Sequence, residues 1–248
     1  MTGPRTYIHE FVEIRDHNRA NYFQHITANW GPIGQREREQ LCFGIWGTVG
    51  STARWPEVIN LWEYRDWAHL GENFRIECDH PTLQDPSLVP WWSAAVEFRR
   101  GGFDRILVAP EWSPGIEEHC AAGGVRAGCY AHEMLQVPPG ASPELLEMAR
   151  ELAVPAYTAA GASLVGAFRT AMVDDSECIL LWGFPDWAAW AAFEDASDSR
   201  DDLVAWRTAA RRLVSRTHRF LLVDAPLSPL RTGRQPQESD RIDWTTGG

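Results

Sequence analysis

The sequence predicts an α+β protein in which two tandem βαββαβ units pack sheet to sheet as a pseudo-dimeric α/β barrel. The first observation behind this prediction is a repeat, because residues 61–67 (LWEYRDW) return as residues 181–187 (LWGFPDW). The second is the pattern Tyr-x-His-Glu, which occurs at 7–10 and again at 130–133. Self-similarity at a long, nearly constant spacing indicates a duplicated structural unit.

The elements of the first unit follow from its hydrophobic pattern and its turn residues. In 61–67 an apolar run is followed by Asp66, whose side chain can accept hydrogen bonds from the first turn of a helix. Gly31-Pro32 and Gly34 interrupt the first helix. The predicted order is strand 7–15, helix 18–40, strands 42–49 and 58–64, a helix opening at Asp66, a helical stretch over 90–100 and strand 105–110.

The second unit repeats that order. Asp186 takes the place of Asp66, and Ser142 and Pro143 are expected to be the N-cap and first residue of a helix that stops at Gly161. The predicted elements are strand 130–137, helix 143–159, strands 164–171 and 178–184, a helix opening at Asp186, a helical stretch over 202–215 and strand 219–226.

This element order is that of the ferredoxin-like split βαβ sandwich. Helices cover only one face of such a sheet, so the other apolar face needs a cover, which the second copy supplies. We expect a first unit at 1–112, a linker at 113–127 and a second unit at 128–226. The polar segment 227–248 is a tail that either wraps around the surface or is disordered.

Composition excludes several classes of function. The formal net charge of −11 argues against nucleic acid and anionic membranes as partners, since both bind basic surfaces. The absence of lysine excludes Schiff-base chemistry through a side-chain amine. The five cysteines lack Cys-x-x-Cys, and no residue group has the spacing of a closed metal site. Without an apolar run of about 20 residues or a signal core, we expect a cytoplasmic protein with reduced thiols.

The ordered motifs resemble a known family. A tyrosine-led strand, a helix with a Gly-Pro region, FGIWGTVG at 43–50 and LWEYRDW together resemble the NIPSNAP family within the dimeric α/β-barrel superfamily, over roughly 7–110 and 129–226. The resemblance implies the barrel fold. For activity it implies several alternatives, namely cofactor-free monooxygenases, aromatic polyketide cyclases, haem-dependent aldoxime dehydratases and haem-degrading enzymes.

The first strand supplies candidate catalytic residues. Side chains alternate along a strand, so His9 and Glu10 point to opposite faces. The first strand lies beside the third in this topology, and Glu10 is expected near Glu63, where two carboxylates in a dry place raise one pKa and give a neutral acid. The expected neighbours of His9 on the third strand are Asn60, Trp62 and Tyr64.

In the second unit His132 and Glu133 take these places. Glu133 is expected to face Gly183, where the missing side chain leaves room for a ligand, and Arg169 replaces Gly47. The two copies thus differ at positions where a site would lie. We expect that one half keeps a working pocket and that the other mainly braces it.

The thirteen tryptophans are mostly core residues, but so many indoles can also line a large, flat apolar cavity. Each candidate has a structural alternative: a tryptophan can belong to the core, and a histidine can be hydrogen-bonded inside it or lie on the surface. The candidate substrate-binding residues are Trp46, Trp62, Tyr64, His25, His69, Arg169 and Trp182.

We expect a cofactor-independent enzyme that acts on a small apolar or aromatic, polyketide-like metabolite by acid–base catalysis, as a cyclase, isomerase, dehydratase or monooxygenase of secondary metabolism. His9 or His132 would be the base and Glu10 or Glu133 the acid, without a metal. Two alternatives stay open: a haem protein with one histidine as axial ligand, and a non-catalytic binding or scaffold protein. The units form an intramolecular pseudo-dimer, and further pairing into a homodimer is left open.

Overall fold

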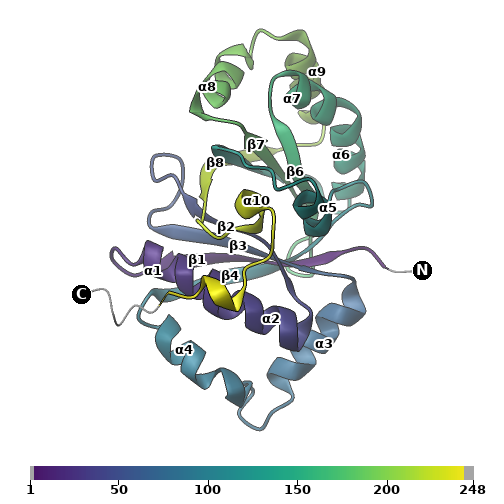
Figure 1. The fold of residues 1–248 in the computed structure, drawn as a ribbon. Coiled ribbons are helices and arrows are strands. Elements are labelled where there is room, and N and C mark those ends of the chain that lie inside the picture. The colour runs from purple at the N-terminus through teal and green to yellow at the C-terminus, as the bar shows by residue number, and fades with distance from the viewer. Residues whose placement is uncertain (1–2, 243–248) are drawn as a thin grey trace.

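The eight strands close into one barrel with the helices outside it (Figure 1). The computed structural model describes residues 3–242. Around the barrel the order is β1-β3-β2-β8-β5-β7-β6-β4, and every neighbouring pair is antiparallel. The strands are β1 (Thr6–Ile14), β2 (Leu41–Thr48), β3 (Glu57–Tyr64), β4 (Arg99–Val108), β5 (Cys129–Gln136), β6 (Ser163–Ala171), β7 (Glu177–Phe184) and β8 (Arg216–Asp224).

Each half of the chain contributes four neighbouring strands. The first half supplies β4-β1-β3-β2 and the second half β8-β5-β7-β6, which is the strand order of two split βαβ units. The halves join at β2–β8 and β4–β6, with three residue pairs at each seam. The predicted pseudo-dimeric α/β barrel is therefore confirmed.

Most helices cover the outer face of the barrel in two groups, which lie at opposite ends of the view in Figure 1, and α5 and α10 lie between these groups. As predicted, Asp66 and Asp186 cap helices: their Oδ1 atoms accept hydrogen bonds from the N–H groups of His69 at 2.9 Å and Ala189 at 2.7 Å. The helices are α1 (Arg19–Gln24), α2 (Gly31–Arg38), α3 (Trp67–Cys78), α4 (Val89–Ala95), α5 (Ile116–Ala121), α6 (Ser142–Met148), α7 (Val154–Ala159), α8 (Trp187–Ala196), α9 (Asp201–Ala210) and α10 (Pro229–Thr232).

The first helix of each half contains a π-helical segment, which the sequence pattern did not reveal. Residues His25–Trp30 form it between α1 and α2, and Ala149–Ala153 form it between α6 and α7. A proline, Pro32 or Pro155, follows within two residues. Because proline has no N–H and clashes with the preceding turn, it disfavours regular i→i−4 bonding there. Such widened turns often occur at functional sites.

One helix start differs from its prediction. Ser142 is the first residue of α6 and not its N-cap, because its hydroxyl donates to the carbonyl of Asp175 at 3.1 Å. The predicted stop at Gly161 is confirmed, and this glycine has a φ of 91°, a conformation that disfavours residues with a Cβ.

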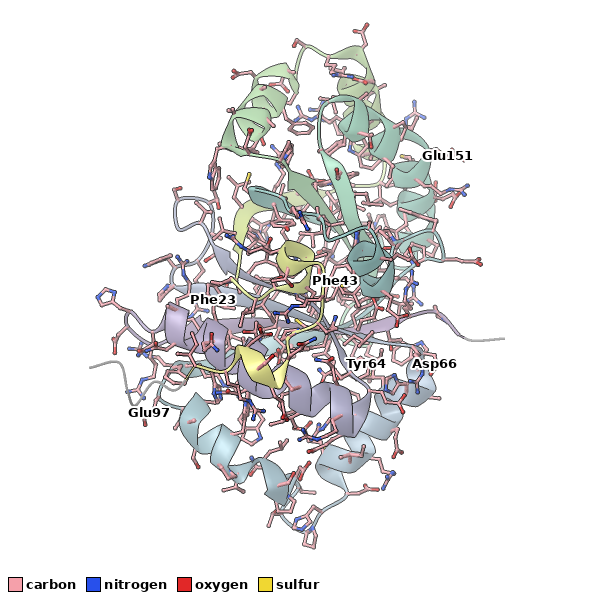
Figure 2. All side chains as sticks on the ribbon, viewed as in Figure 1. Phe23, Phe43, Tyr64, Asp66, Glu97 and Glu151 are labelled. Carbon is pink, nitrogen blue, oxygen red and sulfur yellow. The ribbon has the colours of Figure 1, made fainter. Side chains whose placement is uncertain are left out.

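Aromatic and aliphatic side chains fill the interior of the barrel. Figure 2 shows side chains throughout the space between the two helical groups, with Phe43 labelled near the middle. Separate apolar clusters lie between the sheet and the helices of each half. The space between the two halves is thus packed. The interior cluster includes Tyr7, Phe11, Phe43, Trp46, Tyr130, Phe168 and Phe220.

We predict that Gly44→Ala is strongly destabilising. A Cβ on Gly44 would lie 2.2 Å from ring atoms of Trp46, and Gly166 stands in the same relation to Phe168, at 2.4 Å. Overpacking of this kind lowers the free energy of unfolding by about 1–3 kcal/mol or more. Urea denaturation measures this loss. The control is Gly71→Ala in α3, where no atom lies within 4 Å of the new Cβ; it should gain up to about 1 kcal/mol of helix propensity. Equal effects of the two substitutions would contradict the packing argument.

The polar tail wraps around the first half as far as it is described. The side chain of Gln235 bonds to the backbone N–H and C=O of Cys42, at 2.9 and 2.8 Å, and Arg241 donates to the carbonyl of Ala28 at 3.2 Å. Residues 243–248 lie outside the described part. The expected linker, 113–127, contains α5. Across residues 3–242, no helix is both long and apolar enough to span a bilayer.

Candidate active site

The two histidines and the two glutamates of the repeated motif lie on opposite faces of the barrel wall. His9 and His132 point into the barrel, as part of the same face as the interior aromatics. Glu10 and Glu133 point outward, toward the helices. The predicted alternation is confirmed, but the expectation that one pocket joins a histidine base to a glutamate acid is wrong.

The expected register of the first strand is also wrong. Glu10 lies opposite Asn60, and Glu63 lies opposite Tyr7. The side chain of Glu63 lies on the inner face of the barrel. It accepts hydrogen bonds there from the Tyr7 hydroxyl at 2.9 Å and from the N–H of Ile116 at 3.0 Å. Glu63 is therefore not a partner of Glu10.

Two further pairings in the sequence-based site do not occur. His9 lies opposite Leu61, so Asn60, Trp62 and Tyr64 are on the other face of the sheet. Glu133 lies opposite Leu180, and Gly183 lies opposite Tyr130. These errors have one cause: neither β1 and β3 nor β5 and β7 are joined by a hairpin, so no local turn fixes the register of either pair.

His9 and His132 contact each other at the centre of the barrel. Their Nε2 atoms are 3.2 Å apart and the rings are stacked, with centroids 5.1 Å apart. Burial, followed by the charges of His132 and Arg105, lowers the pKa of His9 well below its usual range. Burial and then Arg105 lower the pKa of His132 to about 3. Both imidazoles are therefore neutral at pH 7 and form one hydrogen bond, with one ring as donor.

Glu10 lies in a cavity of about 300 Å³ between the first-half sheet and its helices, here called the first cavity. Its Oε2 accepts hydrogen bonds from Trp62 Nε1 at 2.7 Å and from Asn60 Nδ2 at 2.8 Å, and no donor within residues 3–242 reaches Oε1. Burial, followed by the nearby Asp104 carboxylate, raises the pKa of Glu10 to about 6. The aromatic residues that line the first cavity are Trp30, Trp62, Tyr64, Phe74, Trp91 and Trp92.

The first cavity is also where unpartnered polar atoms gather. Among the described residues, the buried Tyr64 hydroxyl, the indole N–H groups of Trp91 and Trp92, and Arg38 Nε have no hydrogen-bond partner. The same holds for the acceptor Gln40 Oε1, and all five side chains line this cavity. Buried polar groups are normally satisfied, so such a cluster leaves hydrogen bonds that ordered water or a ligand in the cavity would complete.

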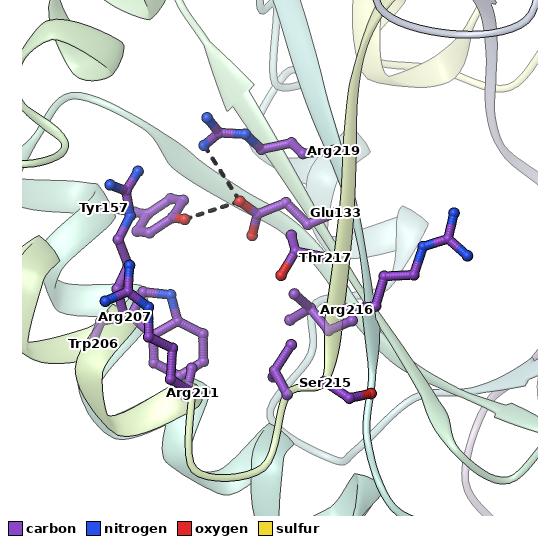
Figure 3. Close-up of a pocket in the computed structure, with 12 residues that line it drawn as sticks. Glu133, Tyr157, Trp206, Arg207, Arg211, Ser215, Arg216, Thr217 and Arg219 are labelled. Atoms are coloured by element: carbon purple, nitrogen blue, oxygen red, sulfur yellow. Dashed lines mark hydrogen bonds and ion pairs between the residues drawn. The ribbon is translucent and has the colours of Figure 1, made fainter.

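The second half has an equivalent cavity of about 340 Å³, here called the second cavity, with Glu133 in its wall (Figure 3). Glu133 Oε1 accepts a hydrogen bond from the Tyr157 hydroxyl at 2.9 Å and forms an ion pair with Arg219 at 3.5 Å. Glu133 Oε2 accepts one from Trp182 Nε1 at 3.0 Å. Both oxygens of Glu133 are thus occupied, whereas Glu10 has one bare oxygen.

The neighbours on the adjacent strand explain this difference. Glu10 lies opposite Asp104 on β4, and Glu133 lies opposite Arg219 on β8. A neighbouring carboxylate favours the protonated form of Glu10. The duplicated carboxylate thus faces a second carboxylate in the first half and forms an ion pair in the second.

The remaining candidates divide between cavity and structural positions. His25 stacks on Trp91 with ring centroids 4.7 Å apart, behind the cavity wall. His69 Nδ1 accepts from the N–H of Arg65 at 3.2 Å, and its Nε2 lies 2.8 Å from the carbonyl of Arg38, so it holds the loop before α3. Trp46 is inside the barrel, and Arg169 lines neither cavity.

Sequence reasoning missed much of the cavity wall. Trp91 and Trp92 come from α4, and Trp30 comes from the π-helical segment. Arg38, at the end of α2, is buried and bonds to Asn73 at 3.2 Å, although arginine is normally exposed. The Trp-Trp pair was the available signal, since the second half has no such pair in α9.

No histidine in the described part of the chain is placed to hold a haem in the first or the second cavity. An axial ligand needs a ring nitrogen that faces an open cavity. No histidine lines the first or second cavity, His69 uses both ring nitrogens, and His9 and His132 face each other in the packed barrel. No cluster among the described residues has the make-up of a metal site.

Comparisons with known proteins agree with the fold. No family model matches the chain. It is 26% identical to Protein NipSnap homolog 3B of Homo sapiens over 237 residues, which cover 93% of this chain and 90% of that protein. The structure is similar to that of an anthrone oxidase-like protein, with a TM-score of 0.61 at 12% identity, covering 90% of this chain and 93% of the other. It is also similar to that of a candidate monooxygenase of Fusobacterium nucleatum, with a TM-score of 0.59 at 10% identity, covering 91% and 94%.

Proposed function

We propose that this NIPSNAP-like chain is an enzyme that moves protons on a small, flat aromatic metabolite bound in the first cavity. The observation that carries the proposal is Glu10, a carboxyl group with one bare oxygen and a pKa of about 6. A base with a pKa near the working pH is suited to general acid–base catalysis. Unlike the sequence-based expectation, the proposal gives the histidines no part in the reaction.

The unpartnered donors around Glu10 favour one class of substrate. Tyr64, Trp91, Trp92 and Arg38 each offer an N–H or O–H, so the substrate should carry oxygen acceptors such as ketone or phenolate groups. Burial raises the pKa of Tyr64, which keeps its hydroxyl a neutral donor. Donors fixed in a desolvated site stabilise an oxyanion that forms when a neighbouring carbon or hydroxyl loses its proton.

The favoured reaction is oxygenation of an activated methylene without a cofactor. Glu10 takes a proton from the CH₂ group, and the electron pair delocalises onto the ring ketone. Molecular oxygen then adds to the carbanion, Glu10 returns the proton to give a hydroperoxide, and loss of water leaves a new ketone. The fold shared with an anthrone oxidase-like protein and a candidate monooxygenase supports this choice within acid–base chemistry.

The test is turnover of anthrone by the purified full-length protein in buffer with a metal chelator. We expect one O₂ consumed for each anthraquinone formed, with no Soret band in the protein. Retention of anthrone without conversion, seen by native mass spectrometry, would support a binding or scaffold role instead. A rate equal to that of buffer, or one that depends on added hemin, would contradict the proposal.

A further inference from the structure

The second cavity has features that the proposed reaction does not use. Figure 3 shows Tyr157, Trp206, Arg207 and Arg211 on one side of it, and Glu133 and Arg219 among the residues on the other. Glu133 already has a donor or cation at each oxygen, so it cannot serve as a base in the way that Glu10 can. If the second cavity has a function, that function is therefore something other than proton transfer by Glu133.

Positive charge is concentrated at this cavity. Residues 207–219 (RTAARRLVSRTHR) contain five arginines and no acidic residue, in a chain whose net charge is −11. Arg207, Arg211 and Arg219 extend toward the cavity, while the guanidinium of Arg216 points away from it (Figure 3). Of these, Arg219 is neutralised by Glu133 and Glu194. Arg207 pairs with Asp198 through Nη1, so among these three the positive charge without an acidic partner in the described part of the chain is that of Arg211.

Arg207 and Arg211 are four residues apart at the end of α9, so their side chains are neighbours on one helix face. Like charges at this spacing repel each other, although the helix C-terminus offsets part of the cost. Arg207 uses only Nη1, which donates to the carbonyl of Ser197 at 2.8 Å and to Asp198 at 2.5 Å. Arg211 has no ion pair within residues 3–242. Two adjacent guanidinium groups with unused N–H donors form a fork that suits a carboxylate or phosphate.

Part of the cavity wall is apolar. Leu135, Trp206, Ala210 and Val214 line it together with the arginines and with Ser215 and Thr217. We propose that the second cavity binds an organic anion, with a carboxylate or phosphate ester on Arg207 and Arg211 and a flat apolar body against Trp206. This inference does not depend on the reaction proposed for the first cavity.

The experiment compares three probes of one shape by isothermal titration calorimetry on the full-length protein: 2-naphthoate, 2-naphthyl phosphate and the neutral 2-naphthalenemethanol. We expect the anions to bind at least tenfold more tightly than the alcohol, because a charge-assisted contact is worth about a factor of ten. Their affinity should fall as salt is raised to 0.5 M, since screening weakens such contacts. The stronger of the two anions identifies the head group.

Arg211→Gln should weaken anion binding about tenfold and leave the alcohol unchanged. The matched control is Arg212→Gln, because Arg212 is exposed on the same helix end and does not line the cavity. Trp91→Ala in the first cavity should also leave anion binding unchanged. The inference is overturned if neither anion binds better than the alcohol, if both arginine substitutions act alike, or if Trp91→Ala alone removes binding.

Discussion

Glu10→Gln should reduce turnover of anthrone by about 10²–10⁴-fold while the protein stays folded. Glutamine keeps the shape of the side chain and an oxygen for the Trp62 and Asn60 donors, but it cannot take up a proton at neutral pH. The loss should therefore appear in kcat, with little change in KM. The measurement is O₂ consumption at saturating anthrone, with thermal unfolding to verify the fold.

Glu63→Gln is the matched control for this substitution. Glu63 is a buried glutamate on β3, the strand next to that of Glu10, but it lies on the inner face and bonds to Tyr7 and Ile116. We expect its substitution to leave turnover within a few-fold of wild type. If Glu63→Gln and Glu10→Gln lowered kcat equally, the assignment of the base to the first cavity would be lost.

The pH dependence should identify the same group. If Glu10 acts as the base, kcat/KM for the free enzyme rises with pH through about 6 and then levels off, because only the carboxylate accepts a proton. Asp104→Asn removes the second cause of the raised pKa, so the limb should move to lower pH. A limb that stays at the same pH in this variant would point to a different titrating group.

Strand identity and strand register differ in how far the sequence determines them. The repeat predicted the strands within a few residues, except that β4 begins at Arg99 and not at 105, and alternation placed His9 and Glu10 on opposite faces. Register is set by pairing between strands that are far apart in the chain. Glu10 on β1 lies opposite Asn60 on β3 and Asp104 on β4. Along β3, the observed partner Asn60 is three residues before Glu63, the partner that was expected.

The positions of the two cavities could not be predicted from the sequence, for a related reason. The duplication predicted a working pocket in one half without saying which elements form it, and the interior between the two halves is filled by aromatic rings. The first cavity instead combines β1, β3, the π-helical segment and α4. Its wall depends on how a widened helical turn places Trp30 against Trp91, whose ring centroids are 5.1 Å apart. Hydrophobic periodicity describes one element at a time and carries no information on such contacts.

Replacing both buried histidines should remove an acid-sensitive part of the stability. His9 and His132 have folded-state pKa values below the ordinary value near 6.5, that of His132 being about 3. The unfolded chain therefore binds more protons than the folded one between these values, and stability falls as pH drops below 6.5. Each histidine contributes up to about 1.4 kcal/mol per pH unit in that window.

The measurement is the free energy of unfolding in urea between pH 7.5 and 4.5, for wild type and for His9→Leu/His132→Leu. Glu10 and Asp224, whose pKa values burial raises to about 6 and about 7, act in the opposite sense because the folded state gains their protons. They are present in both proteins, so the difference between wild type and variant isolates the histidines. We expect wild type to lose stability relative to the variant as the pH falls. Parallel curves for wild type and the double variant would show that the central imidazoles titrate as freely in the folded barrel as in the unfolded chain.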